Sequence, residues 1–280
     1  MNLKVHSTPT SMKMFYIAIT PQLAAELLKG NDINRTLCPG TFDAYARDIN
    51  NNSWVEETGD SISINTEGKL ENGQHRLAAI VKSGKTVKTW VCTGVKPGGL
   101  YDSNRKRTVR DQIAITRPDL ETVYHSSQFQ SVEKFILQHH LGTGRRSLTT
   151  AEMTKFLDDH KDVFDGFFLN FPQSSPAKTG VAIVRTALFM AYCAGVPLES
   201  LTRFFEILTT GLYEPTDKGV QPVIRYRTYL TVDVKGHLSL NLSEVKRCQW
   251  AIERFVANSK AYKTKEPAEL IYPFPFESEK

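Results

Sequence analysis

The chain has 280 residues, of which 40% are hydrophobic and 23% are charged, and its formal net charge is +5. This composition is that of an ordinary globular protein and excludes wholesale disorder. No apolar run is long enough to cross a membrane, and the segment from Met1 to Thr20 lacks the pattern of a signal peptide, so we expect a cytoplasmic protein.

The cysteines are widely separated and form no C-x-x-C pair, which argues against both a disulfide framework and a zinc knuckle. We expect each of them to be a small buried residue. The modest positive charge is compatible with a polyanionic partner but does not require one. The four cysteines are Cys38, Cys92, Cys193 and Cys248.

Strand and helix patterns alternate over the first hundred or so residues. Residues 15–19 are rich in β-formers, and Thr20 with Pro21 is a typical helix start. Thr41 is predicted to cap a second helix. The resulting order, β-α-α-β-α-β, indicates a small α+β domain. In chain order we predict strands at 15–19, 61–64 and 86–92, and helices at 22–29, 42–49 and 74–82.

Beyond Asp111 the apolar residues recur at helical spacing. Thr149 and Glu152 form the pattern of a capping box. We therefore predict a mixed α+β domain over residues 1–115, followed by a mostly α-helical domain over 116–280 with an extended C-terminal tail. The predicted helices of the second domain are 121–140, 149–170, 178–194, 197–210 and 243–260.

The most informative segment is Gly73-Gln74-His75-Arg76, which follows a strand or turn and opens an apolar-periodic helix. A helix N-terminus offers backbone amides and a partial positive charge to an anion. Gly73 would allow close approach of a ligand, Arg76 could fork onto two phosphate oxygens, and His75 could donate a hydrogen bond or move a proton. The same residues are also compatible with a plain turn and a solvated arginine.

Residues 70–79, read as Leu70-x-Asn72-Gly73-Gln74-His75-Arg76-Leu77-x-Ala79, resemble the D-G-Q-H-R type signature of the ParB/sulfiredoxin-like superfamily. The resemblance to phage-type ParB-like proteins extends over about residues 12–115, and includes the Asn34-Arg35 pair and a D-x-x-R-x-R-T-x-x-D element at 102–111. It implies a nucleotide-binding fold that holds ATP or CTP with Mg²⁺. The residues that it assigns to phosphate binding are Asn72, Gly73, Gln74, His75, Arg76, Arg35, Arg105 and Arg107.

This sequence departs from the superfamily pattern at two positions of the box. Asn72 stands where the D-G-Q-H-R type has a carboxylate, although Glu71 is adjacent. Gln74 stands where sulfiredoxins have their cysteine, which excludes sulfinic acid repair. For catalysis we therefore expect His75, Glu71 and Asp102, with the carboxylates acting as base or metal ligand; the metal-ligand set stays open.

Three functions fit these residues. The first is hydrolysis of a nucleoside triphosphate or phosphoryl transfer from it, linked to DNA metabolism. The second is non-catalytic DNA binding, which the missing carboxylate at position 72 favours slightly. The third is a ParB-like nuclease, which ranks last because the acidic residues are scattered. The sequence predicts a nucleotide partner, with DNA as a further one, no membrane partner and no particular oligomeric state.

Overall fold

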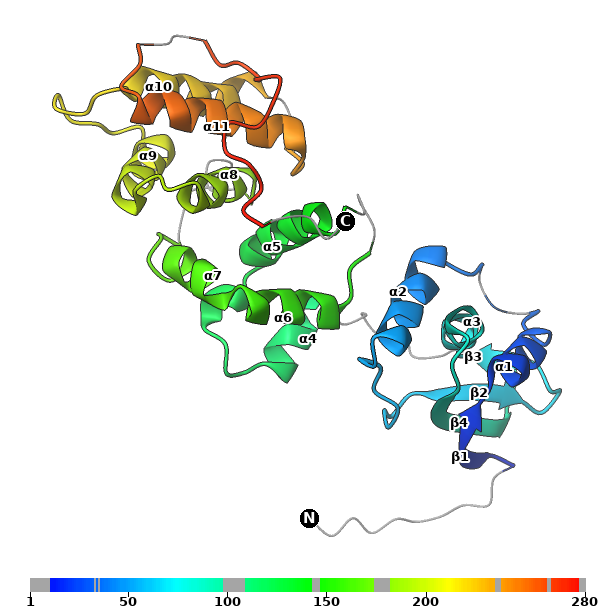
Figure 1. The fold of residues 1–280 in the computed structure, drawn as a ribbon. Helices are drawn as coiled ribbons and strands as arrows, with labels where there is room; N and C mark the ends of the chain where they lie inside the picture. Colours follow the sequence, from blue (N-terminus) through cyan, green and yellow to red (C-terminus); the bar gives the residue numbers. More distant parts are fainter. Residues whose placement is uncertain are drawn as a thin grey trace. The chain divides into compact units, whose positions relative to one another are not determined.

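The computed structural model describes residues 11–32, 34, 36–97, 109–142, 147–173, 182–234, 238–260 and 263–276. The chain divides into two compact units, Met1–Lys106 and Arg107–Lys280. This division precedes the boundary that we predicted after residue 115, because helix α4 (Val109–Thr116) contributes Ile113 to the hydrophobic core of the second unit. The fold class is α+β, with one sheet in the first unit and helices throughout the second (Figure 1).

The first unit contains a four-stranded sheet in the order β1-β4-β2-β3. Strand β4 is central: it pairs antiparallel with β1 and parallel with β2, which pairs antiparallel with β3. The segment before Gly73, predicted as a strand or turn, is the short strand β3. The elements are β1 (Lys13–Ile19), α1 (Pro21–Leu28), α2 (Pro39–Asn50), β2 (Ser61–Asn65), β3 (Leu70–Asn72), α3 (Gln74–Ser83) and β4 (Val87–Val95).

Helices α1, α2 and α3 share one core with the sheet. Apolar residues of the strands, such as Ile62 and Val91, pack with Leu77 and Ile80 of α3. The predicted cap at Thr20 is confirmed, since its side chain accepts a hydrogen bond from the Leu23 amide at 3.1 Å. The predicted cap at Thr41 is wrong: α2 begins three residues earlier than predicted, at Pro39, with Cys38 as its N-cap. Pro39 is already fixed in a helical φ and opens the first turn.

The second unit contains helices and no strand among its described residues. The capping box of Thr149 and Glu152 is confirmed, but the single helix predicted from there to residue 170 divides at His160. Helix α10 lies outside the five helices that we predicted for this unit. The elements are α4, η1 (Thr122–His125), α5 (Ser127–His140), α6 (Thr150–Asp159), α7 (Lys161–Phe168), α8 (Ala182–Cys193), α9 (Leu198–Thr210), α10 (Val220–Thr228), η2 (Tyr229–Asp233) and α11 (Leu242–Val256).

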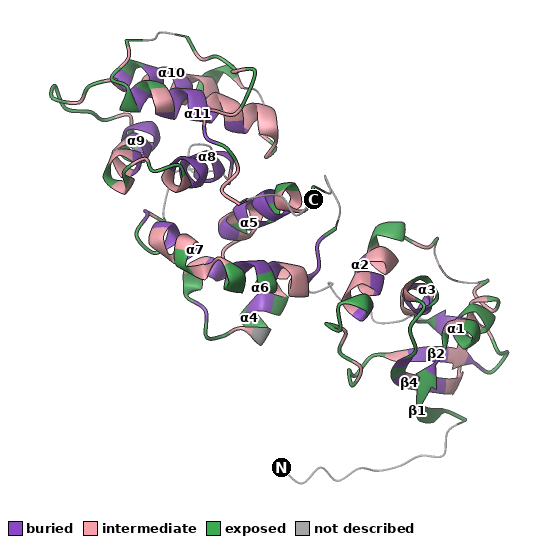
Figure 2. Ribbon diagram, viewed as in Figure 1, coloured by how far each residue is buried: buried purple, intermediate pink, exposed green. Residues whose placement is uncertain are grey.

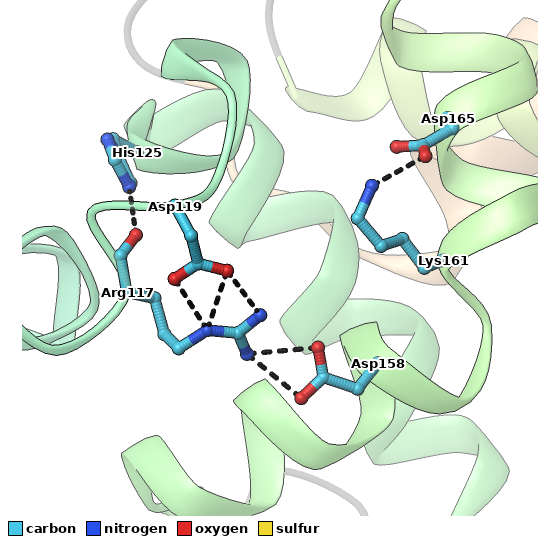
Figure 3. A network of polar contacts seen from close by, with 6 residues as sticks. All are labelled: Arg117, Asp119, His125, Asp158, Lys161 and Asp165. Carbon is cyan, nitrogen blue, oxygen red and sulfur yellow. Dashed lines mark hydrogen bonds and ion pairs between the residues drawn. The ribbon is translucent and has the colours of Figure 1, made fainter.

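An aromatic core and an arginine-centred network hold the helical unit together. Phe129 contacts the rings of Phe164 and Phe168 in the buried interior. Arg117 forks onto Asp119 on one side and Asp158 of α6 on the other, which ties the segment after α4 to α6 (Figure 3). Bidentate pairs of this kind fix orientation as well as charge.

Buried and exposed residues separate clearly on the helices of both units (Figure 2). Of the cysteines, Cys92 and Cys248 are buried as predicted, whereas Cys193 is partly exposed and Cys38 is exposed. Among the described residues, no helix has both the length and the apolar character needed to cross a bilayer.

Candidate functional site

A pocket of about 260 Å³ lies in the first unit at the start of α3. Four of its lining residues are the predicted box, Gly73 to Arg76, and Asn72 joins them from β3. The structure therefore brings the core of the predicted phosphate site together around one cavity. The complete lining is Asn34, Thr41, Tyr45, Asp60, Asn72, Gly73, Gln74, His75 and Arg76.

Two helices begin at this pocket. Helix α3 starts directly after Gly73, and α2 contributes Thr41 from its first turn and Tyr45 one turn later. Both helices are long enough, at 12 and 10 residues, to present a substantial positive partial charge at their N-termini. The pocket therefore lies beside two helix N-termini, whose partial positive charges favour an anion.

Gly73 has a structural reason to be glycine that differs from the one we predicted. Its φ is +104°, a left-handed conformation that other residues adopt only with strain. A Cβ at this position would also lie 2.9 Å from Cγ1 of Ile62 in β2. Gly73 thus permits a close approach between the start of α3 and β2.

Arg76 is held at the pocket wall by backbone carbonyls. Its Nη1 donates to the Asp60 oxygen and its Nη2 to the Ser61 oxygen, both at 2.7 Å. Burial lowers the pKa of Arg76, while the negative charge of Asp60 acts in the opposite direction. A guanidinium has five N–H donors, so two carbonyl contacts leave others for a ligand. Arg76 is therefore both an anchor for the start of β2 and a fixed cation beside the cavity.

His75 joins α3 to the start of α2. Its Nε2 lies 3.0 Å from the backbone nitrogen of Cys38 and accepts that N–H. An imidazole nitrogen that accepts a hydrogen bond carries no proton, so this contact assigns the neutral tautomer with the proton on Nδ1. Because Nε2 accepts the Cys38 N–H, the predicted hydrogen bond or proton transfer from His75 to a ligand would have to use Nδ1.

A chain of side-chain amides orders the loop beside the box. Asn34 donates from Nδ2 to Oδ1 of Asn31 at 2.7 Å and to the Leu70 carbonyl at 2.5 Å. Asn31 in turn donates to Oε1 of Gln74 at 3.0 Å. Gln74 is almost completely buried, so these contacts satisfy its carbonyl while fixing the first residue of α3.

Glu71 does not line the pocket, which corrects its predicted role as base or metal ligand. Its Oε1 accepts from Nδ2 of Asn65 at 2.7 Å, and Oδ1 of Asn65 accepts the amides of Glu67 and Lys69. Successive residues of a strand point to opposite faces, so Asn72 reaches the pocket and Glu71 does not. Glu71 instead stabilises the turn between β2 and β3.

The predicted site residues did not include four residues of the pocket: Asn34, Thr41, Tyr45 and Asp60. From the sequence, Thr41 was interpreted as a helix cap and Tyr45 as part of an apolar helix face. In the structure, the Tyr45 ring also packs edge-to-face on Trp54. Asp60 had no signal in the motif, because it lies on the segment before β2 and reaches the box only through the fold. The one sequence feature that could have indicated Asp60 was its position as a polar residue just before a predicted strand.

Four predicted site residues, Arg35, Asp102, Arg105 and Arg107, lie outside the described residues. Within the described ranges no group of three or more His, Cys, Asp or Glu side chains could hold a metal ion. Asp60 does line the pocket, and its negative charge acts on Arg76. One or two carboxylates together with substrate phosphates and water are the usual ligands of Mg²⁺, so this donor set fits a nucleotide-bound ion.

The chain was compared with models of protein families, with curated proteins and with solved structures, and none of them matches it.

Proposed function

We propose that the first unit binds a nucleotide, ATP or CTP, through its phosphates at the pocket where α2 and α3 begin. The observation that carries this proposal is the convergence of two helix N-termini and the Arg76 guanidinium on one polar cavity. Each of these features attracts phosphate oxygens, and together they form an anion site. The superfamily resemblance of the box points to the same ligand class.

The pocket residues have distinct tasks in this proposal. Arg76, positioned by the Asp60 and Ser61 carbonyls, directs its remaining N–H groups to phosphate oxygens. His75, neutral and oriented by the Cys38 amide, donates from Nδ1. Asp60 would hold Mg²⁺, and the ion would offset phosphate charge. Hydrolysis or phosphoryl transfer, linked to DNA metabolism, would then depend mainly on positioning and charge neutralisation.

The size of the cavity limits how much of the ligand it encloses. A volume of about 260 Å³ lies below the range of pockets that enclose a drug-sized molecule, about 300–1,000 Å³. The cavity therefore encloses the phosphates, with the base outside it. We expect weak discrimination among bases by the described residues.

Binding without turnover is the second candidate, with DNA phosphates as the alternative ligand. It is favoured by the engagement of Glu71 with Asn65 and of His75 Nε2 with Cys38, which occupies two of the predicted catalytic groups. In this case the affinity for DNA should fall steeply with salt, because phosphate contacts release counterions.

The test is a calorimetric titration of ATP, CTP, GTP and UTP, with and without Mg²⁺, followed by a phosphate-release assay. Arg76→Ala should abolish nucleotide binding. Circular dichroism checks that the variant stays folded. Asn72→Asp provides a variant of an exposed side chain at the pocket. It should weaken binding without Mg²⁺ and recover it with Mg²⁺, because a carboxylate repels phosphate but binds the ion.

The matched control is Asn51→Asp, the same substitution at an exposed position after α2 and outside the pocket lining. It should leave the affinity unchanged. Failure of every nucleotide to bind the wild-type chain would reject the proposal, and salt-sensitive DNA binding by the same protein would then support the second candidate.

A further inference from the structure

Strand β1 is an edge strand with an unusually apolar and exposed surface. Its sequence, Lys13-Met-Phe-Tyr-Ile-Ala-Ile19, contains a single charged residue. Met14, Phe15 and Ile17 are between 38% and 58% exposed. Figure 2 shows most of this strand in the colour of exposed residues. Exposed large apolar side chains are scattered singly elsewhere on the first unit, so their concentration here marks a contact surface.

The exposure follows from the position of β1 in the sheet. Phe15 pairs with Val91, and Ile19 with Val87, so these residues share the face that the helices cover. The helices bury Val87, Val91 and Ile19, but leave Phe15 and Ile17 largely open. On the opposite face Tyr16 lies against Trp90, with ring centroids 5.1 Å apart.

Apart from the charge of Lys13 at its start, β1 has none of the usual devices that protect a sheet edge. The register with β4 runs without a bulge from Lys13 to Ile19, and the strand contains no proline. Within the described residues no strand pairs with its outer edge. A long, regular, apolar edge of this kind is a template for another strand, since its outward N–H and C=O groups need partners.

We propose that β1 is a dimerisation edge, to which a second copy of the chain adds its own β1 in antiparallel orientation, making one eight-stranded sheet from two four-stranded ones. This interface is separate from the nucleotide pocket and does not depend on it.

The sequence of β1 is complementary to itself in this arrangement. A two-fold axis at Tyr16, the midpoint, pairs all seven residues and places Phe15 opposite Ile17. Pairs of an aromatic and a β-branched residue are among the favourable cross-strand contacts. Lys13 of each copy then lies opposite Ile19, so the two lysines are at opposite ends. Parallel pairing would instead bring the lysines together, and like charges in this position are destabilising.

The size of the contact sets its strength. One added strand covers less than the ~800 Å² per partner that a standard interface buries. We therefore expect a weak dimer with a dissociation constant of about 1–100 μM, and not an obligate one.

Sedimentation equilibrium of the full chain tests this inference across that concentration range. The wild-type mass should rise from monomer to dimer, and Ile17→Lys should raise the dissociation constant at least ~10-fold, because two buried charges would face the partner strand. Val81→Lys, at a similarly exposed valine of α3, is the matched control and should dimerise normally. Circular dichroism verifies that each variant is folded.

Thiol cross-linking in a Cys38→Ser background tests the register, since Cys38 is the exposed native cysteine among the described residues. Tyr16→Cys should cross-link to itself, and Met14→Cys should cross-link to Ala18→Cys rather than to itself. A wild-type chain that stays monomeric over the whole range overturns the inference. So does a dimer that Ile17→Lys leaves intact, which would place the interface elsewhere.

Discussion

His75 accepts the backbone N–H of Cys38 through Nε2, at 3.0 Å, and this one contact joins the starts of α2 and α3. The two helix N-termini that border the pocket are therefore held together by a residue of the predicted box. The proposed site and the local fold depend on the same side chain.

Replacing His75 should separate its contribution to the stability of the fold from its contribution to nucleotide binding. Removing the acceptor in His75→Leu leaves the Cys38 amide without this partner, which we expect to cost about 1–2 kcal/mol of unfolding free energy. His75→Gln can still accept through its side-chain carbonyl and should recover part of that loss. Urea unfolding measures the stability and nucleotide titration the affinity. Equal stability of the two variants would show that the contact contributes nothing.

Gly73→Ala should destabilise the first unit by about 2–4 kcal/mol, since a left-handed φ and a Cβ 2.9 Å from Ile62 combine strain with overlap. The control is Gly84→Ala at the other end of α3. Gly84 also has a positive φ, but nothing lies within 4 Å of its added Cβ, so we expect a cost of about 1 kcal/mol.

A second change isolates the overlap. Ile62→Ala removes the Cγ1 atom that the new Cβ meets, so the double variant should lose less stability than the sum of the two single variants. Thermal unfolding of the four proteins completes the cycle. Strict additivity would mean that the left-handed backbone conformation alone, without the overlap, accounts for the cost of replacing Gly73.

Glu133 should make the helical unit less stable as the pH rises. It is completely buried, and neither carboxyl oxygen has a hydrogen-bond partner among the described residues. Burial raises the pKa of Glu133 well above its usual range, and the negative charge of Asp158 adds to this. The folded state therefore binds the proton more tightly than the unfolded chain, so its stability is greatest below the ordinary pKa of glutamate and falls above it.

Glu133→Gln removes that proton linkage. The unfolding free energy of the variant, relative to wild type, should increase between pH 5 and pH 8, as measured by urea denaturation. Glu121→Gln, at an exposed position of the same unit, should show no such trend. If the Glu133→Gln and wild-type curves run parallel with pH, Glu133 has a partner that neutralises it.

Arg185 should be among the most sensitive positions of the second unit. It is 1% exposed and donates from Nη1 and Nη2 to the carbonyls of Pro172 and Gln173. Arg185→Met keeps the apolar volume but leaves both carbonyls without these donors, at an expected cost of about 2–4 kcal/mol. Arg225→Met removes a half-exposed arginine and should change stability by less than about 0.5 kcal/mol. Similar costs for the two would contradict this account.

The sequence predicted local features better than the contacts between distant segments. The helix start at Gly73 and the caps at Thr20 and Thr149 depend on a few neighbouring residues, and the structure has them where expected. The hydrogen bonds from Arg76 to the Asp60 and Ser61 carbonyls span 16 and 15 residues of sequence, and no periodicity in the sequence predicts them.

In the candidate site, too, the contacts between distant segments were not predicted from the sequence. The box residues could be found because they are consecutive, whereas Tyr45 and Asp60 join them only through the packing of α2 and β2. Glu71 was assigned to the site because it adjoins the box in sequence. Strand alternation sends its side chain to Asn65, a consequence that becomes certain only once β3 is known to be a strand.

The most direct measurement of the central claim is amide chemical-shift mapping of the isotope-labelled chain during addition of ATP. We expect the largest shifts at Gly73–Arg76 and at Cys38, Gly40 and Thr41, because phosphate would lie between these two helix starts. Saturable shifts confined to both segments would agree with the account. Shifts absent from both, while nucleotide binds elsewhere or not at all, would contradict it.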